Sequence, residues 1–139
     1  MHTISNEELQ AINLLEQVTG AHAKDAVISE DSIIFVVEKG ELGRAIGKQG
    51  ASINRLRKAF GRGVEVVEEA GELQGFLANV FAPAQIRETR VSDVQGRRVA
   101  TVVVDPKNKG LAIGRGGERV RKARLLAKRH FGMDDVKII

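Results

Sequence analysis

The feature that most constrains this chain is an internal duplication with a period of 67 residues. The β-branched run at residues 33–37 returns as a similar run at residues 100–104. The glycine-rich segment at residues 43–50 returns at residues 110–117, and both contain Ala-Ile-Gly, a basic residue, any residue and Gly. Because two separate patterns keep one register, we interpret the chain as one structural unit that occurs twice.

Each copy predicts the same order of elements, namely helix, strand, strand, short helix, glycine loop, helix and strand. The expected strands lie at residues 25–29, 32–38, 64–67, 86–94, 97–105 and 136–139. Asp31 and Gln95-Gly96 are the expected turns between paired strands. Helices and strands that alternate in this way favour the α+β class, with two domains at residues 1–70 and 71–139.

The first copy opens with an amphipathic helix. Ser5 and Glu8 have the spacing of a capping box, and Gly20 is expected to end the helix. Its apolar face is expected to consist of Leu9, Ile12, Leu15 and Val18. The second copy repeats the start at residues 72–74, and Pro83 is expected to end that helix.

A longer helix is expected after each glycine loop, and both helices end in Phe-Gly. Phe60 and Phe131 are 71 residues apart, whereas the repeat has a period of 67. The second helix is therefore expected to be longer by four residues, which is about one turn.

Composition narrows the possible classes of function. The sequence has no Cys, and its three His residues lack the spacing of metal ligands, so we expect neither a metal nor another cofactor. No segment approaches the roughly 20 apolar residues of a membrane-spanning helix, and the first residues lack the pattern of a signal peptide. The sequence therefore predicts a cytoplasmic protein without a membrane partner.

The charge is distributed unevenly. Residues 1–70 contain 8 basic and 11 acidic residues, whereas residues 71–139 contain 14 basic and 7 acidic residues. The two halves thus carry formal charges of −3 and +7. An excess of this size favours a polyanionic partner for the second half, although a solvated basic surface would give the same count.

Each glycine loop lies between two predicted helices. Glycine allows the backbone to approach a ligand closely, and the N–H groups at a helix start favour a phosphate. Lys48 and Arg115 add a cation to each loop, and Gln49 can donate a hydrogen bond. The loops are therefore expected to hold phosphate groups, with Ile46 and Ile113 buried in the core beneath them.

Other sites for phosphate or nucleic acid fit the sequence less well. A P-loop needs four residues between its first Gly and Gly-Lys-Ser/Thr, but Gly43 precedes Gly47 by one position too few and Gln49 replaces the hydroxyl residue. The dinucleotide-binding G-x-G-x-x-G motif is absent. Base stacking on exposed aromatic side chains is disfavoured because the chain has no Trp or Tyr and five Phe. No nucleophile with a base can be named, so no catalytic residue is expected.

With the motifs at residues 45–50 and 112–117 in place, the chain resembles tandem KH domains of the prokaryotic (type II) topology. The pair is similar to the KH core of NusA transcription factors in their short archaeal form. The resemblance implies a factor in transcription elongation or termination that binds single-stranded RNA by its backbone at each Gly-x-x-Gly loop. It also implies RNA polymerase or another transcription factor as a protein partner, and no enzymatic activity.

The candidate RNA contacts combine the two matched loops with basic residues near them. The loop residues are Gly47, Lys48, Gln49, Gly50, Gly114, Arg115, Gly116 and Gly117. The neighbouring basic residues are Arg44, Arg55, Arg119 and Lys122. Since the first copy has fewer basic residues near its loop, its RNA contact is expected to be the weaker one.

Two other functions remain open at the level of sequence. A ribosome-associated or ribosome-assembly KH protein would use the same loops, although such proteins usually carry long basic extensions that this sequence lacks. A protein-interaction scaffold would keep the KH domains for their shape and dock a partner on the acidic first half.

Overall fold

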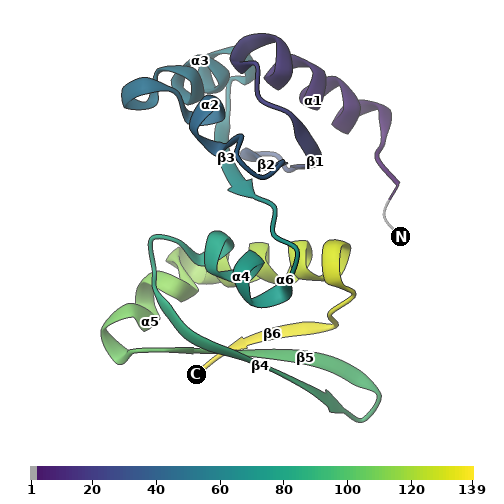
Figure 1. Cartoon of the computed structure of the whole chain (residues 1–139), viewed down its shortest axis with the longest axis vertical. Helices are drawn as coiled ribbons and strands as arrows, with labels where there is room; N and C mark the ends of the chain where they lie inside the picture. Colours follow the sequence, from purple (N-terminus) through teal and green to yellow (C-terminus); the bar gives the residue numbers. More distant parts are fainter. Residues whose placement is uncertain (1–2) are drawn as a thin grey trace. The chain divides into compact units, whose positions relative to one another are not determined.

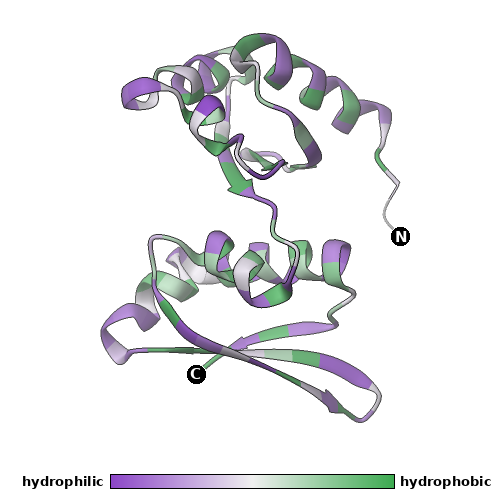
Figure 2. Cartoon of the chain, in the orientation of Figure 1, coloured by the Kyte–Doolittle hydropathy of each residue, from purple (hydrophilic) through white to green (hydrophobic). Residues whose placement is uncertain are grey.

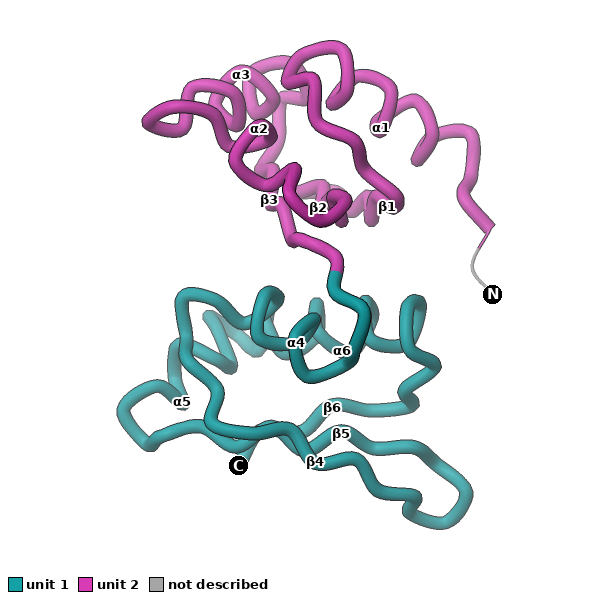
Figure 3. Tube along the Cα trace, in the orientation of Figure 1, with its two compact units in different colours: residues 1–2, 70–139 teal, residues 3–69 magenta. Residues whose placement is uncertain are grey.

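A computed structural model describes residues 3–139. The chain divides into two compact units, an amino-terminal unit of Thr3–Glu69 and a carboxy-terminal unit of Ala70–Ile139 (Figures 1 and 3). Each unit is a three-stranded sheet with three α-helices on one face. The α+β class and the repeated order of elements predicted from the sequence are confirmed.

The amino-terminal unit consists of α1 (Asn6–Thr19), β1 (Ala23–Ile28), β2 (Ser32–Val37), α2 (Leu42–Ile46), the 3-10 turn η1 (Lys48–Gly50), α3 (Ala51–Phe60) and β3 (Gly63–Glu68). Strands β1 and β2 form an antiparallel hairpin. Strand β3 pairs parallel to β2, with Phe35 opposite Val66. The chain must therefore cross from β2 to β3 through α2 and α3, and this crossover carries the glycine loop.

Helix α1 begins where the sequence predicts. The Ser5 hydroxyl accepts a hydrogen bond from the Glu8 N–H, and the Glu8 carboxylate accepts one from the Ser5 N–H. The predicted apolar face is wrong at Leu9, which is 49% exposed. The residues of α1 that are buried are Glu8, Ala11, Ile12 and Leu15. This set has the i, i+3, i+4, i+7 spacing of one helix face, and the capping Glu8 occupies its first position.

The core of the amino-terminal unit lies between its helices and its sheet. Leu15 from α1, Phe35 from β2 and Leu56 from α3 have no exposed surface and belong to one cluster. The Phe60 ring packs against this cluster, with its centroid 5.8 Å from that of Phe35. Figure 2 shows the corresponding alternation of hydrophobic and hydrophilic bands along α1. The helices are thus held on the sheet by apolar contacts from one face each.

The carboxy-terminal unit repeats this plan with α4 (Leu73–Phe81), β4 (Ile86–Val94), β5 (Arg97–Val104), α5 (Pro106–Ile113), the 3-10 turn η2 (Arg115–Gly117), α6 (Glu118–Phe131) and β6 (Asp135–Ile138). Its sheet has the order β4-β5-β6, in which β4 and β5 are antiparallel and β5 and β6 are parallel. The two units therefore have the same topology.

Two elements are longer in the carboxy-terminal unit. Helix α6 has 14 residues and α3 has 10, so the extra turn predicted from the sequence is confirmed. Strands β4 and β5 have nine and eight residues, whereas β1 and β2 have six each. Gln95 and Gly96, with φ of 52° and 81°, form the two-residue turn between β4 and β5. Both extensions leave the glycine loop unchanged.

The core of the carboxy-terminal unit also joins helices to sheet. Leu126 from α6 and Val136 from β6 have no exposed surface. Phe76 from α4 packs against Phe131 from α6, with 5.3 Å between the ring centroids. The extra turn of α6 therefore extends the apolar contact with α4 and does not break the buried face.

None of the helices within residues 3–139 combines the length and the apolar character needed to cross a bilayer. The same residues contain no group of three or more His, Cys, Asp or Glu placed to hold a metal ion.

The buried position of Leu56 gives a test of the amino-terminal core. Leu56→Ala is expected to lower the free energy of unfolding of this unit by about 2–5 kcal/mol, because it removes buried apolar contacts and leaves a cavity. Lys58→Ala, two residues away on an exposed position of α3, is the matched control and is expected to cost less than about 0.5 kcal/mol. Hydrogen exchange read separately in the two units measures both values. Equal effects of the two variants would contradict this account of the core.

Candidate nucleic-acid interface

The two glycine loops have the same backbone conformation. Gly47 ends α2 with φ 78° and ψ 170°, and Gly114 ends α5 with φ 79° and ψ 169°. Gly50 and Gly117 then precede the long helices with φ of 77° and 78°. In both loops the N–H of the last glycine donates to the carbonyl of the first at 3.1 Å. The glycines that match in the sequence repeat therefore also have nearly equal backbone dihedral angles.

Gly47 and Gly114 are glycines for two physical reasons. Positive φ with ψ near 170° is a region of backbone conformation that is essentially restricted to glycine. In addition, a Cβ on Gly47 would lie 2.7 Å from the backbone N of Ser52, and a Cβ on Gly114 would lie 2.8 Å from that of Arg119. The loop backbone thus packs directly on the first turn of the next helix.

The third loop position differs between the two units. Gln49 has φ 54° and ψ 29°, and its counterpart Gly116 has φ 62° and ψ 20°. A residue with a side chain is uncommon in this left-handed region, which costs it about 1–2 kcal/mol. Gln49 is exposed at the tip of the first loop.

Three predicted cations are free to meet a ligand. Lys48 and Arg115 are exposed inside their loops, and Arg55 is exposed on the first turns of α3. Across residues 3–139, the side chains of these three make no hydrogen bond or ion pair. Nothing in the described part of the fold competes with a phosphate for their charge.

Two other predicted contacts are engaged within the fold. Arg44 on α2 lies 3.7 Å from a carboxylate oxygen of Glu41 and 3.5 Å from the carbonyl of Gly20. Arg119 on α6 donates to the carbonyls of Phe81 and Ala82, at the carboxyl end of α4. Arg119 therefore ties α6 to α4 within the carboxy-terminal unit. Lys122, the last of the predicted contacts, lies half-buried on α6.

Arg121 is a further basic residue in the first turns of α6, and its contact with the second loop was not predicted from the sequence. Its guanidinium donates to the carbonyl of Gly116 at 2.7 Å and so holds the tip of the second loop. The equivalent residue in the first unit is Asn54, whose side-chain oxygen accepts from Arg57 at 3.0 Å. The basic residues that follow Arg115 in the sequence indicate a cation near the loop, but they do not reveal which loop atom Arg121 reaches.

The expectation that Ile46 and Ile113 lie in the core is wrong for Ile46. Its side chain is 37% exposed, and that of Ile113 is half-buried. The buried residue of each short helix is the preceding alanine, Ala45 or Ala112. Since the alanine takes the buried position of each short helix, the isoleucine after it keeps part of its surface exposed beside the loop.

Comparison with known proteins agrees with this geometry. Residues 12–70 match the family model described as "KH domain", and residues 73–137 match the one described as "NusA-like second KH domain". A protein of Halococcus morrhuae named "Probable transcription termination protein NusA" is 38% identical over 136 residues, covering 98% of this chain and 97% of that protein. The chain belongs to the NusA family.

Other NusA proteins and a solved structure support the assignment. A protein of Methanococcus vannielii with the same name is 30% identical and matches 98% of this chain and 79% of its own length. The NusA of Rickettsia conorii, named "Transcription termination/antitermination protein NusA", is 30% identical over 84% of this chain but only 23% of its own length. The crystal structure of APE1850 superposes with a TM-score of 0.89 at 37% identity, covering 98% of this chain and all of that one. The predicted KH fold and NusA resemblance are confirmed.

Substitution of Gly47 tests the close approach of the first loop to α3. Gly47→Ala is expected to lower the free energy of unfolding of the amino-terminal unit by more than about 3 kcal/mol, because strain and steric overlap add. Gly61→Ala is the control, since Gly61 also has positive φ (68°) but a Cβ there would meet nothing within 4 Å. It is expected to cost about 1–2 kcal/mol. Chemical denaturation measures both, and equal losses would show that the approach to α3 carries no constraint.

Substitution of Arg119 tests its place between α6 and α4. Arg119→Ala is expected to lower the free energy of unfolding of the carboxy-terminal unit by about 1.5–3 kcal/mol, the range for hydrogen bonds from a charged group. Lys128→Ala, at an exposed position of the same helix, serves as the control and is expected to have little effect. If Arg119→Ala left stability unchanged and weakened RNA binding alone, the residue would be a direct contact and not a structural anchor.

Proposed function

We propose that this NusA-family chain is a transcription termination or elongation factor that binds single-stranded RNA through its two glycine loops. The observation that carries the proposal is the duplicated loop, which presents one backbone conformation and one unpaired cation twice. The names of the NusA relatives, which cover nearly the whole chain, support the role in transcription.

The proposed binding mode uses backbone and charge, and not aromatic stacking. A phosphate of the RNA lies against the loop backbone, where glycine leaves no side chain in the way. Lys48 in the first loop and Arg115 in the second neutralise phosphate charge, and Gln49 donates from the first loop tip. Arg55 adds a further cation beside the first loop. RNA held in this way keeps its base edges free to be read by the neighbouring surface.

The same features argue for a binding protein and against an enzyme. The residues gathered at each loop are glycines and cations, and within residues 3–139 no loop side chain has a partner that would act as its base. We therefore assign no catalytic residue, metal or cofactor to the site. A role in transcription implies a cytoplasmic location, with RNA polymerase or another transcription factor as the protein partner.

A matched pair of double variants tests the proposal. Lys48→Asp with Arg115→Asp introduces a negative charge into each loop and is expected to reduce affinity for single-stranded RNA at least about tenfold. It is also expected to make the affinity less sensitive to salt. The slope of log affinity against log salt concentration should become shallower by about 0.7 for each phosphate that the variant no longer binds. Binding of labelled single-stranded RNA across a salt series measures both effects.

The control double variant is Lys58→Asp with Lys128→Asp. It makes the same change in net charge at exposed positions near the carboxyl ends of α3 and α6. It is expected to retain most of the affinity, because those positions lie at the far ends of the helices from the loops. If both double variants bound as well as the unmodified chain, the loops would not be the RNA site. Partner capture with the acidic amino-terminal unit would then test the scaffold function.

A further inference from the structure

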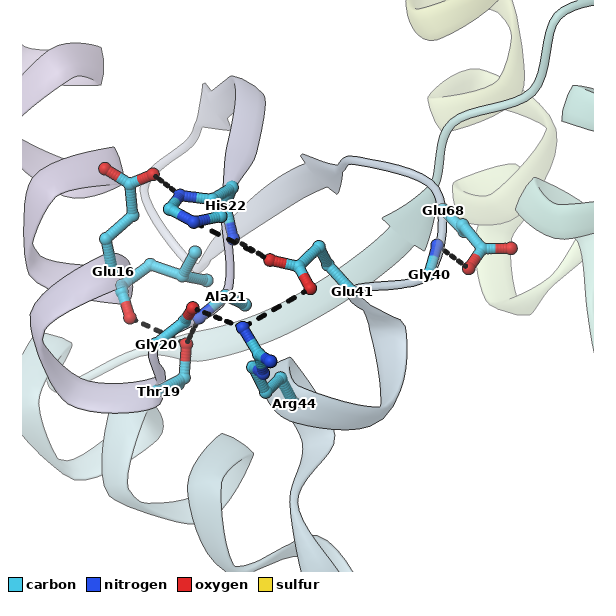
Figure 4. Close-up of polar contacts among 10 residues, drawn as sticks. Glu16, Thr19, Gly20, Ala21, His22, Gly40, Glu41, Arg44 and Glu68 are labelled. Carbon is cyan, nitrogen blue, oxygen red and sulfur yellow. Dashed lines mark hydrogen bonds and ion pairs between the residues drawn. The ribbon is translucent and has the colours of Figure 1, made fainter.

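A polar cluster beside the first loop contacts the side chain of Arg44 (Figure 4). His22 lies just before β1, and its Nδ1 is 2.9 Å from a carboxylate oxygen of Glu16 on α1. On the other side, its backbone N–H donates to Glu41 at 3.1 Å, and its Nε2 lies 4.0 Å from the same carboxylate oxygen. The second oxygen of Glu41 faces Arg44. One carboxylate is therefore shared between an imidazole and a guanidinium.

Arg44 is only loosely bound by its two partners within the fold. Its distances of 3.7 Å to Glu41 and 3.5 Å to the Gly20 carbonyl are long for a fully formed ion pair and hydrogen bond. The side chain is 63% exposed, whereas that of Glu41 is 16% exposed. The carboxylate is thus the fixed partner, and Arg44 is the one that can move to a ligand. Arg44 lies on α2, two residues before the short helix ends at the loop.

The carboxy-terminal unit lacks this cluster. The repeat places Asn108 and Leu111 at the positions of Glu41 and Arg44. Gln85, which precedes β4 as His22 precedes β1, takes the place of the histidine. The cluster is therefore an addition to the first loop and no requirement of the fold.

We propose that His22 and Glu41 are positioning residues that set the availability of Arg44 for RNA phosphate at the first loop, and that protonation of His22 releases Arg44. The inference rests on the proposed RNA-binding function and adds a regulation of that same site. With neutral His22, Nδ1–H donates to Glu16 and Nε2 carries no proton, so among residues 3–139 Arg44 is the one cation that faces the Glu41 carboxylate. A proton from solvent on Nε2 places a second cation against Glu41, which weakens its hold on Arg44.

The charges around His22 favour this protonation. The hydrogen bond to Glu16 raises the pKa of His22 above its ordinary value of 6.5, and the negative charges of Glu16, Glu41 and Glu38 add to the increase. Glu16 lies on α1, Glu41 immediately precedes α2, and Glu38 immediately follows β2. Arg44 is the cation on the opposite side of Glu41. Since the pKa is raised, the protonated form persists to a pH above 6.5 and is lost as the pH rises further.

The test measures RNA binding by the first loop alone. In a chain carrying Arg115→Asp, affinity for single-stranded RNA is followed from about pH 5.5 to about pH 8.5 at constant ionic strength, a range that spans histidine titration. Affinity is expected to fall about two- to fivefold as the pH rises through the His22 transition, the range for one exposed ion pair. His22→Gln is expected to remove the transition. Glu41→Gln, which keeps an oxygen for the His22 N–H, is expected to give the low-pH affinity at all pH values.

The control replaces the two other histidines of the chain, as His2→Gln with His130→Gln, and is expected to retain the transition. A transition that survives His22→Gln, or a Glu41→Gln variant with no gain of affinity at high pH, would overturn the proposal. Binding that depends on Lys48 but not on pH would also overturn it while leaving the proposed function intact. No binding at any pH, in the unmodified chain as well, would instead contradict the proposed function.

A measurement without RNA tests the control of Arg44 by His22 independently of whether the first loop binds RNA. NMR relaxation of the Arg44 side chain in the unmodified chain is expected to report greater mobility at the acidic end of the same pH range than at its basic end. In Glu41→Gln the mobility is expected to be high at both ends. Equal mobility at the two ends in the unmodified chain would show that His22 does not control Arg44, whatever the RNA result.

Discussion

Both loops depend on one close approach of backbone to backbone. Gly47 and Gly114 lie so near the next helix that a Cβ on either would come within 2.7–2.8 Å of a backbone nitrogen. This contact turns the chain out of a short helix and into a long one across a single 3-10 turn. The loop conformation is therefore set by packing within the crossover and exists before any ligand binds. A ligand that meets a preformed loop does not bear the entropic cost of ordering it.

The two units hold this one conformation by different means. The tip residue of the first loop is Gln49, whose side chain restricts the backbone but strains it in the left-handed region. The tip of the second loop is Gly116, which is unstrained but has more conformations to lose, and the Arg121 guanidinium tethers its carbonyl. A strained residue in one loop and a tethered glycine in the other give dihedral angles within about 10° of each other.

The fold could be predicted from the sequence because the β-branched run and the glycine motif occur twice in one register. Two copies of one pattern fixed the order of elements and the extra turn of α6. Side-chain positions were harder to predict, since they depend on neighbours distant in sequence. Ile46 is exposed because Ala45 takes the buried position of α2, and Leu9 is exposed because the capping Glu8 takes its place on the buried face. The carbonyls that Arg119 reaches lie 37 and 38 residues away, where no local pattern indicates them.

The uneven charge of the chain is reflected in the residues that surround each glycine loop. The acidic amino-terminal unit places Glu16, Glu38 and Glu41 around His22, beside its own glycine loop, so that Arg44 is shared between carboxylates and any incoming phosphate. The loop of the basic carboxy-terminal unit has no such competitor for Arg115 among the described residues. Lys48 in the first loop and Arg115 in the second are therefore cations at any pH near neutrality. The first loop differs in having Arg44 beside it, and on our proposal the availability of that third cation follows the protonation of His22.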